Sequence, residues 1–240
     1  MMILYPAIDL KNGKCVRLIQ GKMNKETVFN NDPLLQAKSF VDQGCEWLHL
    51  VDLDGALSQS LVNQTIIKKI ISTVPIPVQL GGGIRNFKTI EHLISVGVQR
   101  IILGTIALSD PQLVKKACKY FPNKIAIGID AKNSKVMVEG WIKKSKMSVF
   151  DLAKSFEDVG VSAIIYTDIS KDGMMLGPDI SGTKKLLEYI SIPIIASGGV
   201  SSISDLKKLK KDCSELNGIV CGRALYDKKI NIDEAIRVLN

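Results

Sequence analysis

Histidines, paired cysteines and long apolar runs are scarce in this chain of 240 residues. It has two histidines and five scattered cysteines, none of them in a C-x-x-C pair. We therefore expect neither a metal site nor a metal-bound cofactor. Free thiols favour a reducing compartment. The apolar runs fall far below the roughly 20 residues that span a bilayer, and the N-terminus lacks a charged region with a cleavage site. These absences predict a cytoplasmic protein with no membrane partner.

Aromatic residues make up only 5% of the chain, which bears on its excess of basic residues. The formal net charge of +8 could indicate a nucleic-acid-binding protein. The lysines, however, lie in short helical clusters such as 207–211, with few aromatics between them. A solvated surface explains this pattern better, so we expect no nucleic-acid partner. The charge would help to attract an anionic small substrate.

Short β-branched segments alternate with amphipathic segments along the whole chain. Eight candidate strands span residues 3–9, 47–51, 77–80, 100–103, 125–130, 163–167, 192–197 and 218–221. Helical periodicity appears between them, for example at 33–43 and 148–158. Continuous apolar strands are typical of a parallel sheet covered by helices. Eight such units fit a (β/α)8 barrel better than a doubly wound open sheet. We predict an α/β fold, a single-domain TIM barrel over residues 1–240.

A phrase near the N-terminus returns after about half of the chain. AIDLKNGKCV at 7–16 is echoed by GIDAKNSKVM at 128–137, which aligns Asp9 with Asp130 at an offset of 121. Three other landmarks recur at nearly the same offset: Val51-Asp52 with Thr167-Asp168, Gly82 with Gly198, and Gly104 with Gly222. One copy of four strands would leave open sheet edges, which two copies would close. We therefore expect a half-barrel duplication, with halves of about 1–121 and 122–240.

Barrel enzymes carry their sites where the strands end, so strand-end residues predict the active site. Glycines at strand-to-helix turns let backbone N–H groups approach a phosphate. Such residues occur in both halves: Gly82, Gly83, Gly104 and Thr105 in the first, and Ser197, Gly198, Gly199, Gly222 and Arg223 in the second. Tight turns alone would explain a single pair. Two equivalent sets predict two phosphate sites, and hence an elongated substrate with a phosphate at each end.

Asp9 and Asp130 would face each other between these phosphate sites. Paired carboxylates suit general acid and base catalysis, and burial would raise the pKa of an aspartate enough for one to keep its proton. A β-like segment rather than a helix follows each aspartate, which argues against helix capping. Further candidates for holding the substrate are Thr167, Arg17, His49, Trp141, Asp172, Gly173 and Gly177. His49 could equally be a hydrogen-bonded residue of the barrel interior, and Trp141 a residue packed on the rim.

Motifs along the whole chain resemble one enzyme family. They are PAIDLKNGKCVRLIQG (6–21), HLVDLDGA (49–56), QLGGGIR (79–85), ILGT (102–105), GIDAK with EGW (128–132 and 139–141), YTDISKDGMMLGP (166–178), ASGGVSS (196–202) and VCGRALY (220–226). Together they resemble the histidine-biosynthesis isomerases of phosphoribosylformimino aminoimidazole carboxamide ribotide. The resemblance implies an enzyme without metal or organic cofactor that performs an Amadori aldose-to-ketose rearrangement on a bisphosphorylated ribotide.

By the same resemblance, Asp9 would be the base that removes the C2 proton of the opened ribose. Asp130 would be the acid that protonates the ring oxygen, and Thr167 the hydroxyl that assists at the centre. The near symmetry of the repeat leaves open which aspartate is acid and which is base. We expect a small bisphosphorylated ribotide as the partner and a monomeric enzyme.

Three alternatives stay open at this point. A related cyclase shares the barrel, the two aspartates and the phosphate sites, but Ala7-Ile8-Asp9-Leu10 and Gly140-Trp141 favour the isomerase. A dual-substrate isomerase would also accept phosphoribosylanthranilate. A non-catalytic binder of a phosphate ligand or of nucleic acid would keep the barrel, but the presence of both carboxylates and both glycine pairs argues against decay of the site. Tyr5 and Lys171 depart from the usual family residues without replacing an acid or a phosphate-site glycine.

Overall fold

The structure is a computed structural model that describes residues 1–58, 61–132, 135–138, 140–141 and 143–240. Eight parallel strands form the barrel: β1 (Ile3–Lys11), β4 (Leu48–Asp52), β5 (Val78–Gly81), β6 (Arg100–Leu103), β7 (Ile125–Lys132), β10 (Ala163–Asp168), β11 (Ile194–Ser197) and β12 (Gly218–Cys221). The ring closes because β7 pairs with β10 and β12 pairs with β1. The predicted (β/α)8 fold and all eight predicted strands are confirmed, with strand ends shifted by at most two residues.

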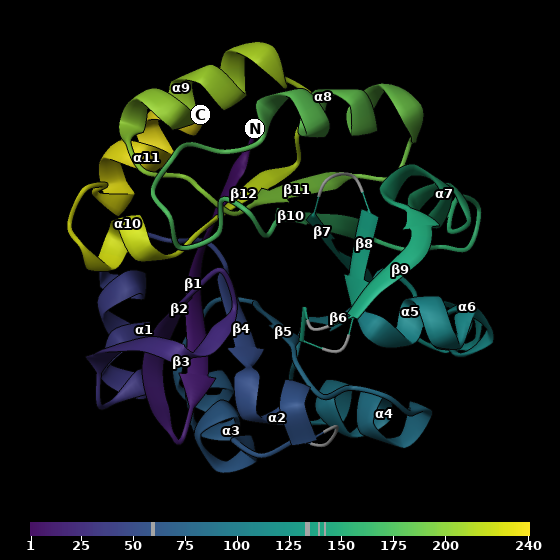
Figure 1. Cartoon of the computed structure of the whole chain (residues 1–240). Helices are drawn as coiled ribbons and strands as arrows, with labels where there is room; N and C mark the ends of the chain where they lie inside the picture. The colour runs from purple at the N-terminus through teal and green to yellow at the C-terminus, as the bar shows by residue number, and fades with distance from the viewer. Residues whose placement is uncertain (59–60, 133–134, 139, 142) are drawn as a thin grey trace.

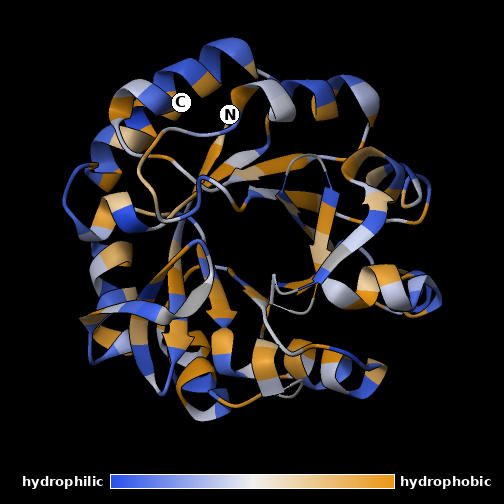
Figure 2. Ribbon diagram, in the orientation of Figure 1, coloured by the Kyte–Doolittle hydropathy of each residue, from blue (hydrophilic) through white to orange (hydrophobic). Residues whose placement is uncertain are grey.

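Helices cover the outside of this ring (Figure 1). The longer ones are α1 (Pro33–Asp42), α3 (Gln64–Thr73), α4 (Phe87–Ser95), α6 (Pro111–Tyr120), α8 (Ile180–Tyr189), α9 (Ile203–Asp212) and α11 (Ile232–Leu239). Shorter ones are α2 (Leu53–Ser58), α5 (Thr105–Ser109), α7 (Val149–Lys154) and α10 (Arg223–Tyr226). Apolar residues fill the strands, and hydrophilic residues lie on the outer faces of the helices (Figure 2). Within the described residues, no helix is long and apolar enough to cross a membrane.

The predicted helix at 148–158 is too long. In the structure α7 ends at Lys154, and residues 155–160 form turns. Ser148 caps its start as a side-chain acceptor for the Asp151 N–H. At the other end, the Ser155 hydroxyl donates to the Leu152 carbonyl at 2.7 Å and so competes with helix continuation. The apolar period extends beyond Lys154, but the backbone tightens there into turns, in which the N–H groups of Phe156 and Glu157 donate to the carbonyls of Ala153 and Lys154.

Two antiparallel arms extend from opposite sides of the barrel. The first arm consists of β2 (Lys14–Ile19) and β3 (Lys22–Asn30) and pairs with β1. The second arm consists of β8 (Lys135–Val138) and β9 (Lys143–Ser148) and pairs with β7. The β-like segments predicted after Asp9 and Asp130 are therefore confirmed. The arms meet at their turns, where a Cβ on Gly21 would overlap the Trp141 ring.

The strand-end turns of the two halves share their backbone conformations. Gly82 and Gly198 have φ of +99° and +92°. Gly104 and Gly222 have φ/ψ of −95°/−105° and −112°/−99°. These equivalent turns are what the sequence repeat predicts. The assignment of two halves meeting near residue 121 stays a prediction.

Asp52, buried at the end of β4, anchors the segment that leads to α3. Its carboxylate accepts hydrogen bonds from the backbone N–H groups of Gly55, Val62 and Asn63 at 2.9–3.1 Å. The Asn63 amide donates a fourth, at 2.7 Å. Asp52→Asn would turn an NH2 group toward these donors, so we expect the free energy of unfolding to fall by about 3 kcal/mol in urea denaturation.

The control for this prediction is Asp32→Asn. Asp32 is the exposed N-cap of α1, where its side chain accepts from the N–H groups of Leu34 and Leu35. Asparagine caps helices as well as aspartate does, so this variant should change stability by less than about 0.5 kcal/mol. Equal stability of the two variants would contradict the anchoring role of Asp52.

Candidate active site

A cavity of about 220 Å³ opens where the barrel strands end. The predicted site residues that line it are Asp9, Arg17, His49, Gly82, Gly83, Gly104, Thr105, Asp130, Trp141, Thr167, Asp172 and Ser197. An adjoining smaller hollow is lined by Gly173, Gly198, Gly199, Gly222 and Arg223. Gly177 lies behind this hollow, where its N–H donates to the Gly199 carbonyl at 2.9 Å. The residues predicted from the strand ends thus lie together around the cavity and the adjoining hollow, and Gly177 supports the hollow through its bond to Gly199.

Asp9 stands at one side of the cavity beside a buried cation. It lies near the end of β1, and the turn into β2 brings Arg17 back alongside, with Arg17 Nη1 2.8 Å from Asp9 Oδ2. Burial raises the pKa of the Asp9 carboxyl to about 6, and Asp172 adds to this rise, whereas Arg17 lowers it. Asp9 therefore titrates near the pH at which a base is useful.

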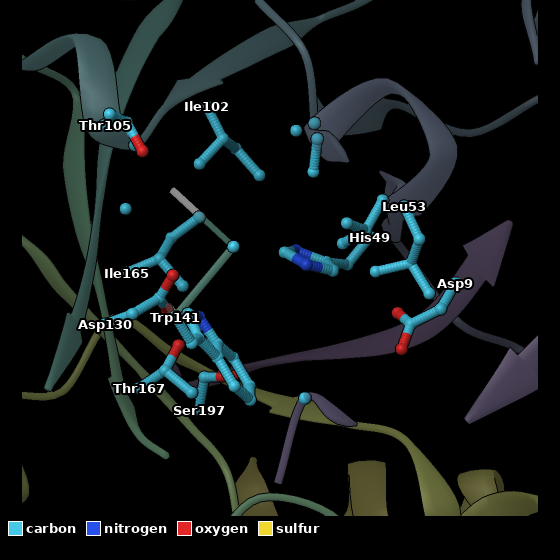
Figure 3. Close-up of a pocket in the computed structure, with 18 of the residues that line it drawn as sticks. Asp9, His49, Leu53, Ile102, Thr105, Asp130, Trp141, Ile165, Thr167 and Ser197 are labelled. Carbon is cyan, nitrogen blue, oxygen red and sulfur yellow. The ribbon is translucent and has the colours of Figure 1, made fainter. Parts of the chain in front are cut away.

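Asp130 lies across the cavity from Asp9 (Figure 3). Parallel pairing of β7 with β10 sets Asp130 beside Thr167. Burial raises the pKa of Asp130, while hydrogen bonds from Trp141 and Thr167 lower it. The Trp141 ring therefore does more than cover the rim: it lies in the cavity and contacts the second acid. Glu139 of the same EGW motif lies outside the described residues.

Asp172, one of the candidates for holding the substrate, lines the cavity and also supports the first arm. Its carbonyl accepts from the Gln20 N–H at 3.2 Å, so the loop after β10 holds the first arm. Its side chain is half-buried in the cavity wall, where loss of contact with water raises its pKa and Arg17 lowers it. The positive charge of Arg17 thus favours the ionised forms of both Asp9 and Asp172. No spacing in the sequence indicates this cluster, because it depends on how the first arm folds back toward β1.

Each half supplies a glycine-lined turn and a short helix. Gly104 precedes α5, Gly222 precedes α10, and Arg223 Nη1 donates to the Gly173 carbonyl at 2.9 Å. Arg85, which was not selected from the sequence, also lines the cavity, with Nη2 3.5 Å from the Ala56 carbonyl. Arg85 comes two residues after the three glycines at 81–83, and Arg223 comes directly after Gly222. A cationic residue after a glycine turn was the signal that could have identified it.

Known proteins resemble this chain along its whole length. A family model described as "Histidine biosynthesis protein" matches residues 3–231. The chain belongs to this histidine biosynthesis family. It is 55% identical to 1-(5-phosphoribosyl)-5-((5-phosphoribosylamino)methylideneamino) imidazole-4-carboxamide isomerase 2 of Ruegeria sp. (strain TM1040), over 99% of each chain. Identity to the isomerase of the same name from Paramagnetospirillum magneticum is 53%, again over 99% of each chain.

A third relative of the histidine biosynthesis family, the isomerase of Rhizobium etli, is 52% identical over 100% of this chain and 97% of its own. The family indicated by the sequence motifs is therefore confirmed. The two residues that depart from the usual family pattern, Lys171 and Tyr5, lie away from the cavity wall. Lys171 Nζ donates to the Pro178 carbonyl at 3.0 Å and holds the loop after β10. Tyr5 is buried inside the barrel, with its hydroxyl 3.3 Å from Arg100 Nη1.

Proposed function

We propose that the protein is an aldose-to-ketose isomerase of histidine biosynthesis that acts on the bisphosphorylated ribotide named for its relatives. One observation carries this function beyond the family: two half-buried carboxyls face each other across a cavity, between two equivalent glycine turns. The acids suit proton transfer at the middle of a substrate. The turns suit a phosphate at each of its ends.

In the proposed reaction, Asp130 gives a proton to the ribose ring oxygen, and the C1–O bond breaks to leave a C1=N bond to the amine. Asp9 then takes the proton from C2, which gives an enol at C2 and a neutral amine at C1. Asp9 returns its proton to C1, and the enol proton leaves to restore Asp130, which produces the ketone. The proton count is unchanged overall. Thr167 and Trp141 support this sequence because both hydrogen-bond Asp130.

The two phosphates of the substrate would occupy opposite ends of the cavity. The first lies against Gly82, Gly83 and the Gly104–Thr105 turn, and the second against Gly199, Gly222 and Arg223. Backbone N–H groups and cations hold such dianions through charge-assisted hydrogen bonds. Two anchors fix the sugar carbon between the acids, which converts binding energy into orientation.

The activity test uses the purified full chain and the aminoaldose ribotide. Formation of the aminoketose, followed by chromatography and mass spectrometry, would support the function. Growth of a strain lacking the histidine isomerase gives a second readout, and a strain lacking phosphoribosylanthranilate isomerase tests the dual-substrate alternative. Rescue of histidine growth alone fits the curated isomerase relatives. Absence of aminoketose would refute the proposal.

The pH profile should reveal Asp9 as the base. Its pKa of about 6 means that the ionised form is lost as the pH falls through that value, so kcat/KM should decline below about pH 6. Arg17 lowers this pKa, so Arg17→Met should move the decline to higher pH. Arg237→Met removes an exposed arginine of α11 that pairs with Asp233 and should leave the profile unchanged. Superimposable profiles for all three proteins would contradict the assignment.

We further propose that the enzyme is a cytoplasmic monomer without a nucleic-acid partner. One chain supplies both acids and both phosphate turns, and its five cysteines are free and buried, as suits a reducing compartment. Sedimentation analysis tests the oligomeric state. Binding to DNA with a steep salt dependence would contradict the absence of a nucleic-acid partner.

A further inference from the structure

Three polar side chains form a layer inside the barrel, below the cavity. They are His49 on β4, Gln79 on β5 and Arg100 on β6, and the strand register sets His49 beside Gln79 and Gln79 beside Arg100. Gln79 is fully buried, and His49 is 8% exposed. Polar groups so deep in a barrel interior cost free energy unless they are hydrogen-bonded. In this layer each of the three side chains has a hydrogen-bond partner among its neighbours.

The cation of the layer fixes the direction of every bond in it. Arg100 Nη1 donates to Gln79 Oε1 at 3.1 Å, and an arginine side chain has no acceptor. The oxygen of the Gln79 amide must therefore face Arg100, which turns its NH2 group toward His49. Gln79 Nε2 lies 2.9 Å from His49 Nδ1. Nδ1 must accept this bond, so the neutral imidazole carries its hydrogen on Nε2.

Arg100 is itself held at the closed end of the barrel. Its Nη1 lies 3.3 Å from the Tyr5 hydroxyl, and its guanidinium lies over the Trp47 ring at 4.7 Å from the centroid. Trp47 and Tyr5 also pack against each other, with ring centroids 5.8 Å apart. The layer therefore has a fixed cation at one end and an imidazole at the other. This anchoring keeps the amide from reversing.

The imidazole reaches into the cavity between the two acids. Figure 3 shows the His49 ring in the space that separates Asp9 from Asp130. Burial and the nearby Arg17 lower the pKa of His49 to about 3, so it stays neutral at any working pH. A neutral ring does not compete with Asp9 or Asp130 for the protons that they transfer. It offers an N–H donor where the middle of the substrate would lie.

We propose that Gln79 is a positioning residue that fixes His49 as a neutral Nε2–H donor to the sugar of the substrate. This inference rests on the proposed isomerase function. When the enol at C2 loses its proton to become the ketone, negative charge grows on the C2 oxygen, and a hydrogen bond from Nε2–H to that oxygen strengthens without transferring a proton. A neutral imidazole plays this part in triosephosphate isomerase, another barrel enzyme.

Nitrogen-15 NMR of histidine-labelled protein tests the tautomer directly, because the chain has only two histidines. A His92→Gln variant, changed on α4 outside the site, assigns the remaining signals to His49. We expect a protonated Nε2 and an unprotonated Nδ1 with no change between about pH 5 and pH 8. A protonated Nδ1, or an imidazolium at neutral pH, would overturn the proposal. This spectrum needs no change in the layer itself.

Gln79→Glu should reverse the direction of the hydrogen bond between residue 79 and His49 while keeping the shape of the side chain. A carboxylate can accept from Arg100 with one oxygen and from His49 with the other, so the hydrogen should move to Nδ1 and leave Nε2 as an acceptor. We expect kcat/KM to fall about 10- to 100-fold, mostly through kcat, because the lost donor acts in the transition state. Gln99→Glu is the control: Gln99 is exposed and accepts from Lys124 Nζ at 2.7 Å.

The two readouts separate the inference from the function on which it rests. An unchanged His49 tautomer in Gln79→Glu would overturn the role of Gln79. A moved hydrogen with the turnover of Gln99→Glu would overturn the use of the donor in catalysis. Wild-type protein without isomerase activity would refute the proposed function, and with it the role in the reaction, whereas the NMR spectrum would still decide whether Gln79 sets the tautomer.

Discussion

Asp9→Asn and Asp130→Asn are each expected to lower kcat by about 10²- to 10⁴-fold, which is what a positioned acid or base contributes. An asparagine at residue 9 keeps the shape of the side chain beside Arg17 but has no basic oxygen for the C2 proton. An asparagine at residue 130 can still accept from Thr167 and Trp141, but it cannot give a proton to the ring oxygen. Steady-state kinetics on both variants measure the effect.

The KM of these variants should stay within a few-fold of the wild type. The phosphate turns lie at the ends of the mouth, and neither substitution touches them. The control is Asp42→Asn at the exposed end of α1, which should leave both constants unchanged. Turnover within about threefold of wild type in both variants would be too small a change for a general acid or base and would refute the assignment.

Gly199→Ala is expected to lower kcat/KM by about 100-fold, mainly through a higher KM for the ribotide. Gly199 has φ of +86°, and a Cβ there would overlap the Gly177 carbonyl oxygen. The same Cβ would lie 2.9 Å from Cβ of Lys171. The turn must therefore move, which takes its backbone N–H groups away from the phosphate. Loss of charge-assisted hydrogen bonds of this kind accounts for the size of the effect.

Gly44→Ala separates backbone strain from this steric effect. Gly44 has φ of +91°, but a Cβ there would meet nothing within 4 Å, and it lies between α1 and β4, away from the cavity wall. It should lose stability in urea denaturation, as any alanine at positive φ does, and keep the wild-type KM. An unchanged KM in Gly199→Ala, or an equal rise in both variants, would contradict the phosphate site at this turn.

The fold was predictable from local patterns because each barrel strand is buried on both faces. Runs such as Ile125–Ile129 are apolar throughout, and capping residues mark several helix starts, as Asp110 does for α6 with Pro111 at the first position. The end of α7 was not predictable in the same way. There the apolar periodicity continues while the backbone changes to three-residue turns after Lys154, a change that no residue pattern marks.

The site was predictable as far as strand ends determine it. That rule gathered Asp9, Asp130 and Thr167 around one cavity without any knowledge of side-chain contacts. It could not predict the pairing of Arg17 with Asp9, which depends on the path of the first arm. Nor could it identify Gln79, since its role depends on neighbours on two other strands. Both alternatives weighed for His49 describe it, because the ring is hydrogen-bonded inside the barrel and lines the cavity.

The contact of Gly21 with Trp141 limits how the two arms beside the cavity could be assembled from two half-barrels. The two positions are separated by nearly the offset that relates Asp9 to Asp130, so they are equivalent places on the two arms. In a symmetric pair of separate half-barrels, each residue at this place would face its own copy. Tryptophan facing tryptophan would not fit, because even a Cβ on Gly21 overlaps the ring, and glycine facing glycine would leave Asp130 without its indole partner. The pairing therefore requires two half-barrels of different sequence, and a single chain that carries both ensures that the small residue of one arm always meets the large residue of the other.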